Sequence, residues 1–320
     1  MSQLRGAVFG AGNMGRHHIR IMAQHPAVEL IAIVDPDTER AQALADEWGG
    51  EVFASVDDIP AIDVAIIATP TAFHAPTALT LIDRGVHLLI EKPLAQTPQL
   101  ARQIVEAARA KGTTLAVGHV ERFNPAIQSL ANLATDPKMI SIERLSPYTP
   151  RIADSVVYDL TVHDIDLACW LAKSEPKHVH AVGAKVFSDT IDVASTVISF
   201  NNGCIATIQT SRATQDKVRR ITISESERYF SANTLRQEVE IKREAEVSYQ
   251  RDEGDIMFTQ ASVVEIPTLQ KGGEPLRLEQ DDFYDAVINK RAPLVTGEDG
   301  LRAVELVDRI EKLCQDTLVE

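Results

Sequence analysis

The chain has 320 residues, a formal net charge of −14 at pH 7, 44% hydrophobic residues and 24% charged residues. This length suits about two domains, and the composition excludes a disordered or fibrous chain. The negative charge argues against nucleic acid or an anionic membrane as a partner, and no apolar run is long enough for a transmembrane helix. The chain lacks the layout of a signal peptide, and its three cysteines are too far apart for a disulfide framework, so we expect a cytoplasmic protein.

Residues 4–120 alternate short apolar strands with helical stretches, which is typical of a parallel sheet covered on both faces. The expected strands are Ala7–Phe9, Leu30–Val34, Val64–Ala68, His87–Ile90 and Thr114–Val117. The expected helices are Met14–Gln24, Thr38–Trp48, Ala75–Arg84 and Pro98–Lys111. We therefore predict an α/β fold that begins with a Rossmann-type, doubly wound parallel sheet over residues 1–121.

After Phe123 the pattern changes to that of an α+β domain with a large, mostly antiparallel sheet. The expected helices are Pro125–Leu133, Tyr158–Ala172 and, at the end of the chain, Gly300–Gln315. The expected strands are Ile140–Leu145, His178–Phe187, Val193–Phe200, Cys204–Arg212, Val218–Ser224 and Tyr229–Asn233. Residues 244–277 give no clear pattern. We assign residues 122–320 to this domain and expect one open sheet face, which suits a homodimer or homotetramer.

The segment Gly10-Ala11-Gly12-Asn13-Met14-Gly15 has the G-x-G-x-x-G spacing, follows a predicted strand and opens a predicted helix. Its glycines allow a tight turn and close approach of the backbone to a pyrophosphate, which would lie on the free N–H groups of the helix. Asp35 ends the next strand, where a carboxylate can bind the adenosine ribose hydroxyls. Pro36-Asp37-Thr38 offers no cation for a 2′-phosphate, so we expect NAD rather than NADP, although Arg40 lies nearby.

Two further loops should border the cofactor, because ligands of open α/β sheets bind beyond the carboxyl ends of the strands. The first loop contains Thr69, Pro70 and His74, and for His74 a loop histidine with no chemical task is an equally open interpretation. The second loop is Glu91-Lys92-Pro93. Most lysines are solvated surface charges, but this placement makes Lys92 a catalytic candidate, because a partly desolvated lysine can shift its pKa and polarise a hydroxyl.

The predicted helix at Tyr158–Ala172 carries Asp159 and His163 four residues apart, with Asp166 and Trp170 on the same face. Apolar residues fill most of the remaining circumference, which is typical of a buried helix, so the polar face should line an internal cleft. Two interpretations stay open: an acid–base pair, or a helix in which Asp159 and His163 merely pair at i,i+4. No third ligand is apparent, so we expect no metal.

The segment Gly118-His119-Val120-Glu121-Arg122-Phe123-Asn124-Pro125 joins the two predicted domains beside the expected cofactor cleft. Glu121, Arg122 and Asn124 are therefore candidate substrate contacts. Arg122 could bind a phosphate or carboxylate bidentately, or could equally pin the joint between the domains. Arg151 is a further candidate anion contact.

Together these motifs resemble the Gfo/Idh/MocA family of NAD(P)-dependent oxidoreductases over essentially the whole chain. The resemblance rests on Gly10–Gly15, Glu91-Lys92-Pro93, the junction Gly118…Arg122…Pro125 and Asp159-x-x-x-His163. It implies that Lys92, Asp159 and His163 line the nicotinamide and a reacting sugar hydroxyl. It also implies a cis Lys92–Pro93 peptide bond and oligomers formed through the open sheet.

Within the family, the junction and the segment from Tyr158 to Leu167 resemble the UDP-N-acetylglucosamine 3-dehydrogenase branch. This implies NAD-dependent oxidation of the sugar C3 hydroxyl to a ketone, on a route to 3-amino sugars of lipopolysaccharide or other surface glycans, with a sugar aminotransferase downstream. His163 would accept the hydroxyl proton, and Asp159 would orient the imidazole of His163 or relay the proton. Lys92 would stabilise the developing alkoxide. Whether Lys92 or His163 takes the proton first stays open.

Three alternatives remain open for the function. The first is a dehydrogenase of another nucleotide sugar, an inositol or a free sugar. The second is a glycosidase that uses bound NAD to oxidise, eliminate and re-reduce its substrate. The third is a non-catalytic NAD-binding regulator, which the set of Lys92, Asp159 and His163 argues against, because a sensor needs no acid–base groups.

Overall fold

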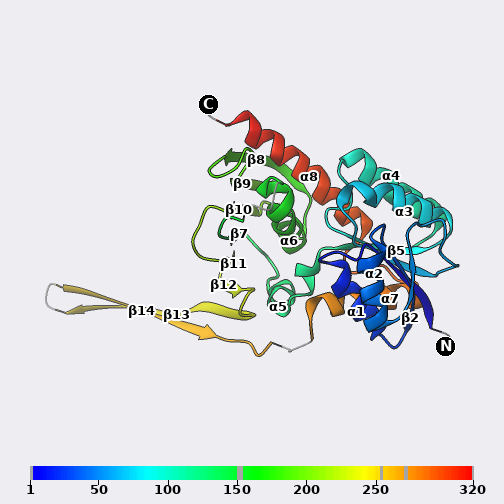
Figure 1. Ribbon diagram of the computed structural model, residues 1–320. Coiled ribbons are helices and arrows are strands. Elements are labelled where there is room, and N and C mark those ends of the chain that lie inside the picture. The colour runs from blue at the N-terminus through cyan, green and yellow to red at the C-terminus, as the bar shows by residue number, and fades with distance from the viewer. Residues whose placement is uncertain (1–2, 150–153, 253–254, 270–272, 319–320) are drawn as a thin grey trace. The chain divides into compact units, whose positions relative to one another are not determined.

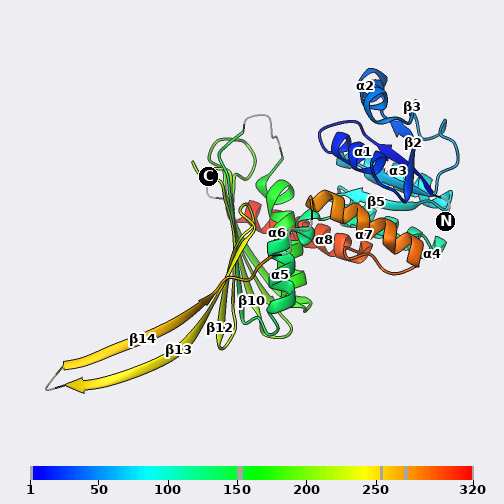
Figure 2. The same ribbon diagram turned by 90° about the horizontal axis from the view of Figure 1, so that it is seen from below.

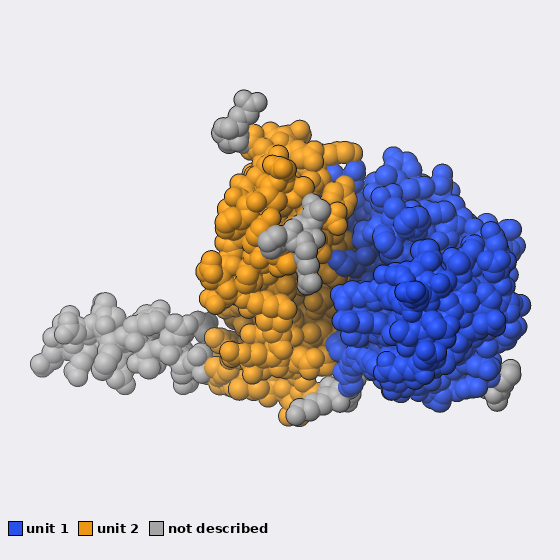
Figure 3. All heavy atoms as spheres, in the orientation of Figure 1, with its two compact units in different colours: residues 1–120, 273–308 blue, residues 121–272, 309–320 orange. Residues whose placement is uncertain are grey.

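The computed structural model describes residues 3–149, 154–252, 255–269 and 273–318. The chain divides into two compact units, shown in different colours in Figure 3. The first unit contains residues 1–120 and 273–308, and the second contains residues 121–272 and 309–320. Among the described residues, no helix combines the length and the apolar character that a membrane span requires.

A six-stranded parallel sheet forms the centre of the first unit, in the order β3-β2-β1-β4-β5-β6. Figure 1 labels β2 and β5 of this sheet. Its strands are β1 (Leu4–Phe9), β2 (Val28–Val34), β3 (Glu51–Phe53), β4 (Val64–Ile67), β5 (His87–Glu91) and β6 (Leu115–Gly118). The strand order reverses beside β1, which is the switch point of a doubly wound sheet. The predicted Rossmann-type sheet is confirmed, with β3 as an additional short strand.

The helices of this unit begin and end at residues suited to helix ends. They are α1 (Gly15–Ala23), α2 (Thr38–Trp48), α3 (His74–Asp83) and α4 (Pro98–Lys111), with a 3₁₀ turn at Thr71–Phe73. The Thr97 side chain accepts a hydrogen bond from the first turn of α4, and Gly112 ends that helix with φ of 74°. The strands are buried because helices cover the sheet, as the side chains of β4 and β6 illustrate.

Residues 273–308 return to the first unit, whereas the sequence placed all of residues 122–320 in the second domain. They contain α7 (Pro275–Asn289), which the sequence did not predict, and the first part of α8 (Gly297–Asp316). The physical reason is packing: Phe283 and Tyr284 of α7 lie in the same apolar core as β1 and α1. Gly297 and Gly300 allow close approach, since a Cβ on either would come within 2.6 Å of Leu115 or Val117.

The second unit is built on an eight-stranded sheet in the order β14-β13-β12-β11-β7-β10-β9-β8. Its strands are β7 (Met139–Leu145), β8 (Pro176–Ala184), β9 (Val193–Phe200), β10 (Ile205–Ser211), β11 (Val218–Ser224), β12 (Arg228–Asn233), β13 (Glu238–Asp252) and β14 (Asp255–Glu265). All these neighbours pair antiparallel except β7 and β10, which are parallel. The predicted large, mostly antiparallel sheet is confirmed.

Helices cover one face of this second sheet. In Figure 2, α5 (Pro125–Leu133) and α6 (Val162–Ala172) lie along the same side of the strands. Side chains alternate accordingly, so that Ile198 and Ile208 are buried while Val197 and Ile205 are 40% and 45% exposed. The long β13–β14 hairpin extends beyond the other strands (Figure 2). It includes part of residues 244–277, for which the sequence gave no clear pattern.

The glycine-rich turn between β1 and α1 is the tightest part of the first unit. Gly10 has a φ of 96°, and a Cβ added to Gly15 would lie 1.8 Å from the Gly10 carbonyl oxygen. A Cβ added to Gly12 would meet nothing within 4 Å. Gly15 is therefore required by the protein's own packing, whereas Gly12 leaves open space in front of the turn.

We predict that Gly15→Ala lowers the free energy of unfolding by about 1–3 kcal/mol, because the turn must open to admit the methyl group. Gly12→Ala is the matched control and should change it by no more than about 0.5 kcal/mol. Urea denaturation followed by circular dichroism measures both. Equal losses in the two variants would contradict this account of the turn.

Candidate active site

The carboxylate of Asp35 is held directly beside the glycine-rich turn. Its Oδ2 accepts a hydrogen bond from the Ala11 N–H at 2.6 Å, and its Oδ1 accepts one from the Asp37 N–H at 2.9 Å. The Arg40 guanidinium also contacts Oδ1, at 2.8 Å. The open turn and the fixed acid at the end of β2 fit a dinucleotide, whose pyrophosphate needs close backbone approach and whose ribose needs an acceptor.

Asn13 and Met14 form the front of this turn, directly before α1. Asn13 is exposed, and its side-chain oxygen accepts a hydrogen bond from Arg16 at 3.0 Å. Met14 is half-buried. Their contact with a cofactor stays a prediction, and their place beside the open space at Gly12 is consistent with it.

His74 ties the two predicted cofactor loops together within the first unit. The side chain is buried, with Nδ1 3.0 Å from the Pro93 carbonyl oxygen and Nε2 2.9 Å from the Thr69 carbonyl oxygen. Burial lowers the pKa of His74, so the ring is neutral near pH 7 and donates to one carbonyl at a time. Its ring nitrogens contact the protein itself, and His74 therefore fixes the loop after β4, which includes Pro70, against the turn after β5.

Glu91 and Lys92 form the turn that ends β5, and the Lys92–Pro93 peptide bond is cis, as the resemblance implied. Lys92 is half-buried, whereas the Glu91 carboxylate is buried and directed into the unit. Glu91 Oε1 lies 2.9 Å from His18 Nε2, and Oε2 accepts a hydrogen bond from the Lys92 N–H at 3.1 Å. Burial by itself would raise the pKa of Glu91, but the interaction with His18, followed by the charge of Lys92, lowers it.

A second buried acid, Glu279 of α7, lies near this pair. Both of its carboxylate oxygens are buried and have no hydrogen-bond partner among the described residues. Burial and then the charge of Glu91 raise the pKa of Glu279 well above its usual value, which favours the protonated, uncharged form of this side chain. Ligand atoms of His18, Glu91 and Glu279 lie within 4.8 Å of one another, which makes them the group within the described chain that could approach a metal ion.

In the second unit, Asp159 and His163 are half-exposed at the start of α6. The sequence expected a continuous α-helix from Tyr158, but Val157–Thr161 forms a π-helical turn before α6 begins. Of the four polar-face residues, only Asp159 lies in the π-helical turn, so α-helical spacing does not describe its place relative to His163, whereas His163, Asp166 and Trp170 all lie in α6. Such turns recur at functional sites, and this one carries Asp159.

Arg212, at the end of β10, is a site residue that sequence reasoning missed. Its guanidinium is buried, and its Nη2 lies 3.7 Å from Asp159 Oδ2. The sequence did place Arg212 as the last residue of the predicted strand Cys204–Arg212. A side chain at a strand end is held in place by the strand, which could have identified Arg212 as a candidate.

The junction residues are held by contacts within the second unit. Arg122 and Asp166, both 2% exposed on their side chains, form a bidentate ion pair with distances of 2.8 Å and 2.5 Å. The Arg122 guanidinium also lies 5.3 Å from the centre of the Trp170 ring. Because its donors already contact Asp166, this geometry favours a pinning role over binding of a substrate anion.

Three further substrate candidates differ in how the structure describes them. Glu121 lies 3.1 Å from the Arg144 guanidinium in an ion pair. Asn124 caps α5 through the Ala126 N–H and donates to a backbone carbonyl. Arg151 lies outside the described residues. Substrate contacts by these residues therefore stay predictions.

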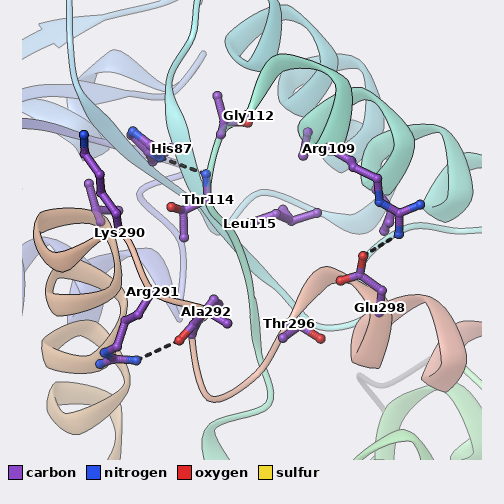
Figure 4. Close-up of a pocket in the computed structure, with 15 residues that line it drawn as sticks. His87, Arg109, Gly112, Thr114, Leu115, Lys290, Arg291, Ala292, Thr296 and Glu298 are labelled. Atoms are coloured by element: carbon purple, nitrogen blue, oxygen red, sulfur yellow. Dashed lines mark hydrogen bonds and ion pairs between the residues drawn. The ribbon is translucent and has the colours of Figure 1, made fainter.

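The first unit also contains a groove of about 690 Å³ lined by His87, Thr114, Arg109, Lys290 and Glu298 among others (Figure 4). His87 begins β5, and Thr114 directly precedes β6, so the groove lies at the amino ends of these strands. The glycine-rich turn and Glu91 lie at the carboxyl ends. We therefore do not assign the cofactor to this groove, because dinucleotides bind beyond the carboxyl ends.

We predict that Arg122→Leu lowers the free energy of unfolding by about 3–5 kcal/mol, because it leaves the Asp166 carboxylate buried without its partner. The double variant Arg122→Met with Asp166→Leu should recover most of this loss, since no charge is then buried. Urea denaturation of both proteins measures the difference. If the double variant is no more stable than the single one, the buried ion pair is not the cause.

We predict that Glu279→Gln becomes more stable relative to the unchanged protein as the pH rises above about 4.5. A raised pKa in the folded state means that folding must keep a proton that the unfolded chain releases, which costs up to about 1.4 kcal/mol per pH unit. Glutamine removes this cost. Melting temperatures of both proteins at pH 5 and pH 8 test the prediction, and a difference that does not grow with pH would contradict it.

Residues 4–119 match an oxidoreductase family with an NAD-binding Rossmann fold, and residues 137–230 match a GFO/IDH/MocA C-terminal domain. UDP-N-acetylglucosamine 3-dehydrogenase of Acidithiobacillus ferrooxidans is 33% identical over 308 residues, which covers 95% of each chain. Its solved structure, GnnA, has a TM-score of 0.90 over 99% of both chains, at 31% identity.

Two more distant proteins have different substrates in their names. Inositol 2-dehydrogenase of Rhizobium meliloti is 27% identical over 330 residues and 95% of each chain. The WlbA dehydrogenase of Bordetella pertussis, solved with NADH and UDP-GlcNAcA, is 18% identical with a TM-score of 0.81 over 98% of this chain and 96% of that one, and shows the fold alone. The two matched domains, the NAD-binding turn and the full-length relative assign the chain to the Gfo/Idh/MocA family of NAD-dependent oxidoreductases.

Proposed function

We propose that this protein oxidises the C3 hydroxyl of UDP-N-acetylglucosamine to a ketone, with NAD as the acceptor. The observation that carries the proposal is the full-length similarity to UDP-N-acetylglucosamine 3-dehydrogenase, at 33% identity over 95% of both chains. The product, a 3-keto sugar, is the substrate that an aminotransferase needs to make a 3-amino sugar. This chemistry fits a precursor pathway for lipopolysaccharide or another surface glycan.

The first unit would bind the cofactor through residues whose geometry is suited to it. The backbone at Gly10–Gly15 would hold the pyrophosphate, and Asp35 would accept hydrogen bonds from the adenosine ribose. Thr69 and Pro70 come just after β4, and Glu91 ends the neighbouring β5, so they would border the same ligand. When bound, NAD supplies the acceptor for the hydride that leaves the sugar carbon.

The second unit would supply the acid–base groups. His163 accepts the proton of the reacting hydroxyl, because a neutral imidazole is the side chain best matched to proton transfer near pH 7. Asp159, four residues earlier and beside the buried Arg212 charge, orients the imidazole or takes the proton onward. Lys92 of the first unit contributes a positive charge that stabilises the developing alkoxide.

We also propose that copies of this chain associate through the open face of the second sheet, as a homodimer or homotetramer. Met139, Val197 and Ile205 are between 40% and 46% exposed on neighbouring strands of that face. Exposed apolar side chains gathered on one sheet face are typical of an association surface.

An inositol or free sugar is the second candidate substrate. The observation that favours it is the similarity to inositol 2-dehydrogenase of Rhizobium meliloti, which also spans 95% of both chains but at 27% identity. The two candidates differ in the nucleoside diphosphate, so they are separated by a direct comparison of UDP-N-acetylglucosamine with myo-inositol.

We predict that the purified protein with NAD and UDP-N-acetylglucosamine forms NADH, read by absorbance, when a transaminase removes the ketone. His163→Ala and Lys92→Met should each lower turnover by about 10²-fold or more, because each removes a group that handles the proton or the negative charge. Reduction of NAD by myo-inositol but not by the UDP-sugar would favour the second candidate. Absence of both turnover and thermal stabilisation with any UDP-sugar would overturn the nucleotide-sugar proposal.

The two remaining alternatives give different outcomes in the same experiment. A redox-elimination glycosidase would retain NAD through purification and cleave a glycoside without net formation of NADH. A non-catalytic regulator would bind a partner equally well with His163→Ala. Either result would replace the dehydrogenase proposal.

A further inference from the structure

A chain of buried hydrogen bonds runs from α7 to the turn that carries Lys92. It begins at Tyr284, whose hydroxyl donates to Gln280 Oε1 at 2.8 Å. The other end of the same amide, Gln280 Nε2, lies 3.0 Å from His18 Nδ1 and 3.3 Å from the His18 carbonyl oxygen. Tyr284, Gln280 and His18 are each no more than 1% exposed, so water cannot replace these contacts.

The direction of this chain fixes the proton on His18. An amide nitrogen only donates, so His18 Nδ1 must be the acceptor of the Gln280 hydrogen bond. With Nδ1 as an acceptor, the ring proton lies on Nε2, which points to Glu91 Oε1 at 2.9 Å. His18 therefore presents an N–H to Glu91 rather than a lone pair, which favours a hydrogen-bonding role over metal ligation at this cluster.

Glu91 connects the His18 ring to the backbone of Lys92. With Oε1 facing His18, its other oxygen accepts the Lys92 N–H at 3.1 Å, so the carboxylate is fixed at both ends. Gly118 on the neighbouring strand leaves room for this arrangement, because a Cβ there would lie 3.0 Å from Glu91 Oε2. A backbone N–H held in this way fixes where the Lys92 side chain leaves the turn.

We propose that His18 is a positioning residue that acts through Glu91 to hold Lys92 in place for catalysis, with Gln280 and Tyr284 setting the orientation of the His18 ring. This inference rests on the proposed function of Lys92. The proposal gives α7, which belongs to residues 273–308 of the first unit, a role in the reaction. Gln280 and Tyr284 of this helix need not touch substrate or cofactor.

Hydrogen exchange at the Lys92 amide tests the network without any substrate. Pro93 has no amide hydrogen, so a short peptide around Lys92 reports few amides besides that of Lys92 itself. His18→Leu removes the donor to Glu91 and should speed exchange at Lys92 by about tenfold or more. His18→Gln, which restores a side-chain N–H donor, should return exchange close to that of the unchanged protein.

Turnover tests whether the network serves catalysis. With NAD and the UDP-sugar, His18→Leu should lower kcat by about 10- to 100-fold, since small displacements of a reacting group have effects of this size. KM for the sugar and the Kd of NAD, measured by calorimetry, should change by no more than a few fold. His18→Gln should recover most of kcat.

Arg20→Leu is the matched control. Arg20 of α1 forms a partly exposed ion pair with Glu274, the residue directly before α7, at 2.7 Å, so it joins the same two segments outside the chain of hydrogen bonds. It should leave kcat and Lys92 exchange unchanged. If His18→Leu does not fold, Gln280→Leu tests the same chain from the other end and should change exchange and kcat in the same directions.

Unchanged exchange at Lys92 in a folded His18→Leu or Gln280→Leu variant would overturn the network. Faster exchange with normal kcat would overturn the positioning role. Equal loss of kcat in His18→Leu and Arg20→Leu would overturn the positioning role, because it would mean that only the joining of α1 to α7 matters. If the unchanged protein turns over no sugar at all, the proposed function fails, while the exchange experiment still decides whether His18 holds the Lys92 turn.

Discussion

The first unit depends on one constraint of direction: in a parallel sheet all carboxyl ends of the strands meet at the same edge. Because β1, β2, β4 and β5 run the same way, the glycine-rich turn, Asp35, the Thr69 loop and Lys92 all begin at that edge. Nothing in the local sequence of any one loop brings the others near it. The unit then adds direct ties, since Ala11 donates to Asp35 and the His74 ring bridges two of the loops. The edge is therefore rigid before any ligand binds, which reduces the entropy that binding must offset.

The second unit contains buried ion pairs. Arg122 with Asp166, and Arg144 with Asp164, are nearly inaccessible, and each pair is stable only because both partners are present. Burial still raises the pKa of Asp164 to about 6, despite the adjacent Arg144. These pairs fix the start of the unit and the helix that carries His163. Asp159 and His163, the proposed acid–base groups, are partly exposed in the same segment, although the Nδ1 atom of His163 is buried.

Much of the fold could be predicted from the sequence, because its signals are local. Apolar runs separated by helical spacing predicted the first sheet, and the succession of expected strands from Ile140 to Asn233 predicted the second. Helix α7 escaped prediction because its buried face includes Glu279 and Gln280, whose polarity hides the pattern that burial normally produces. The π-helical turn and the contact of Arg212 with Asp159 also escaped, since both depend on tertiary packing rather than on spacing along the chain.

The same distinction applies to the candidate site. Cofactor recognition uses backbone N–H groups and one carboxylate, which a short motif can encode, so the prediction of NAD required few residues. Substrate recognition depends on side chains whose partners are set by packing. Arg122 is an example, because a guanidinium is suited to bind a diphosphate, but in the folded protein this one forms an ion pair with Asp166. A nucleotide-sugar diphosphate would then need other donors. Backbone N–H groups are donors that a protein with a net charge of −14 can offer without a further cation.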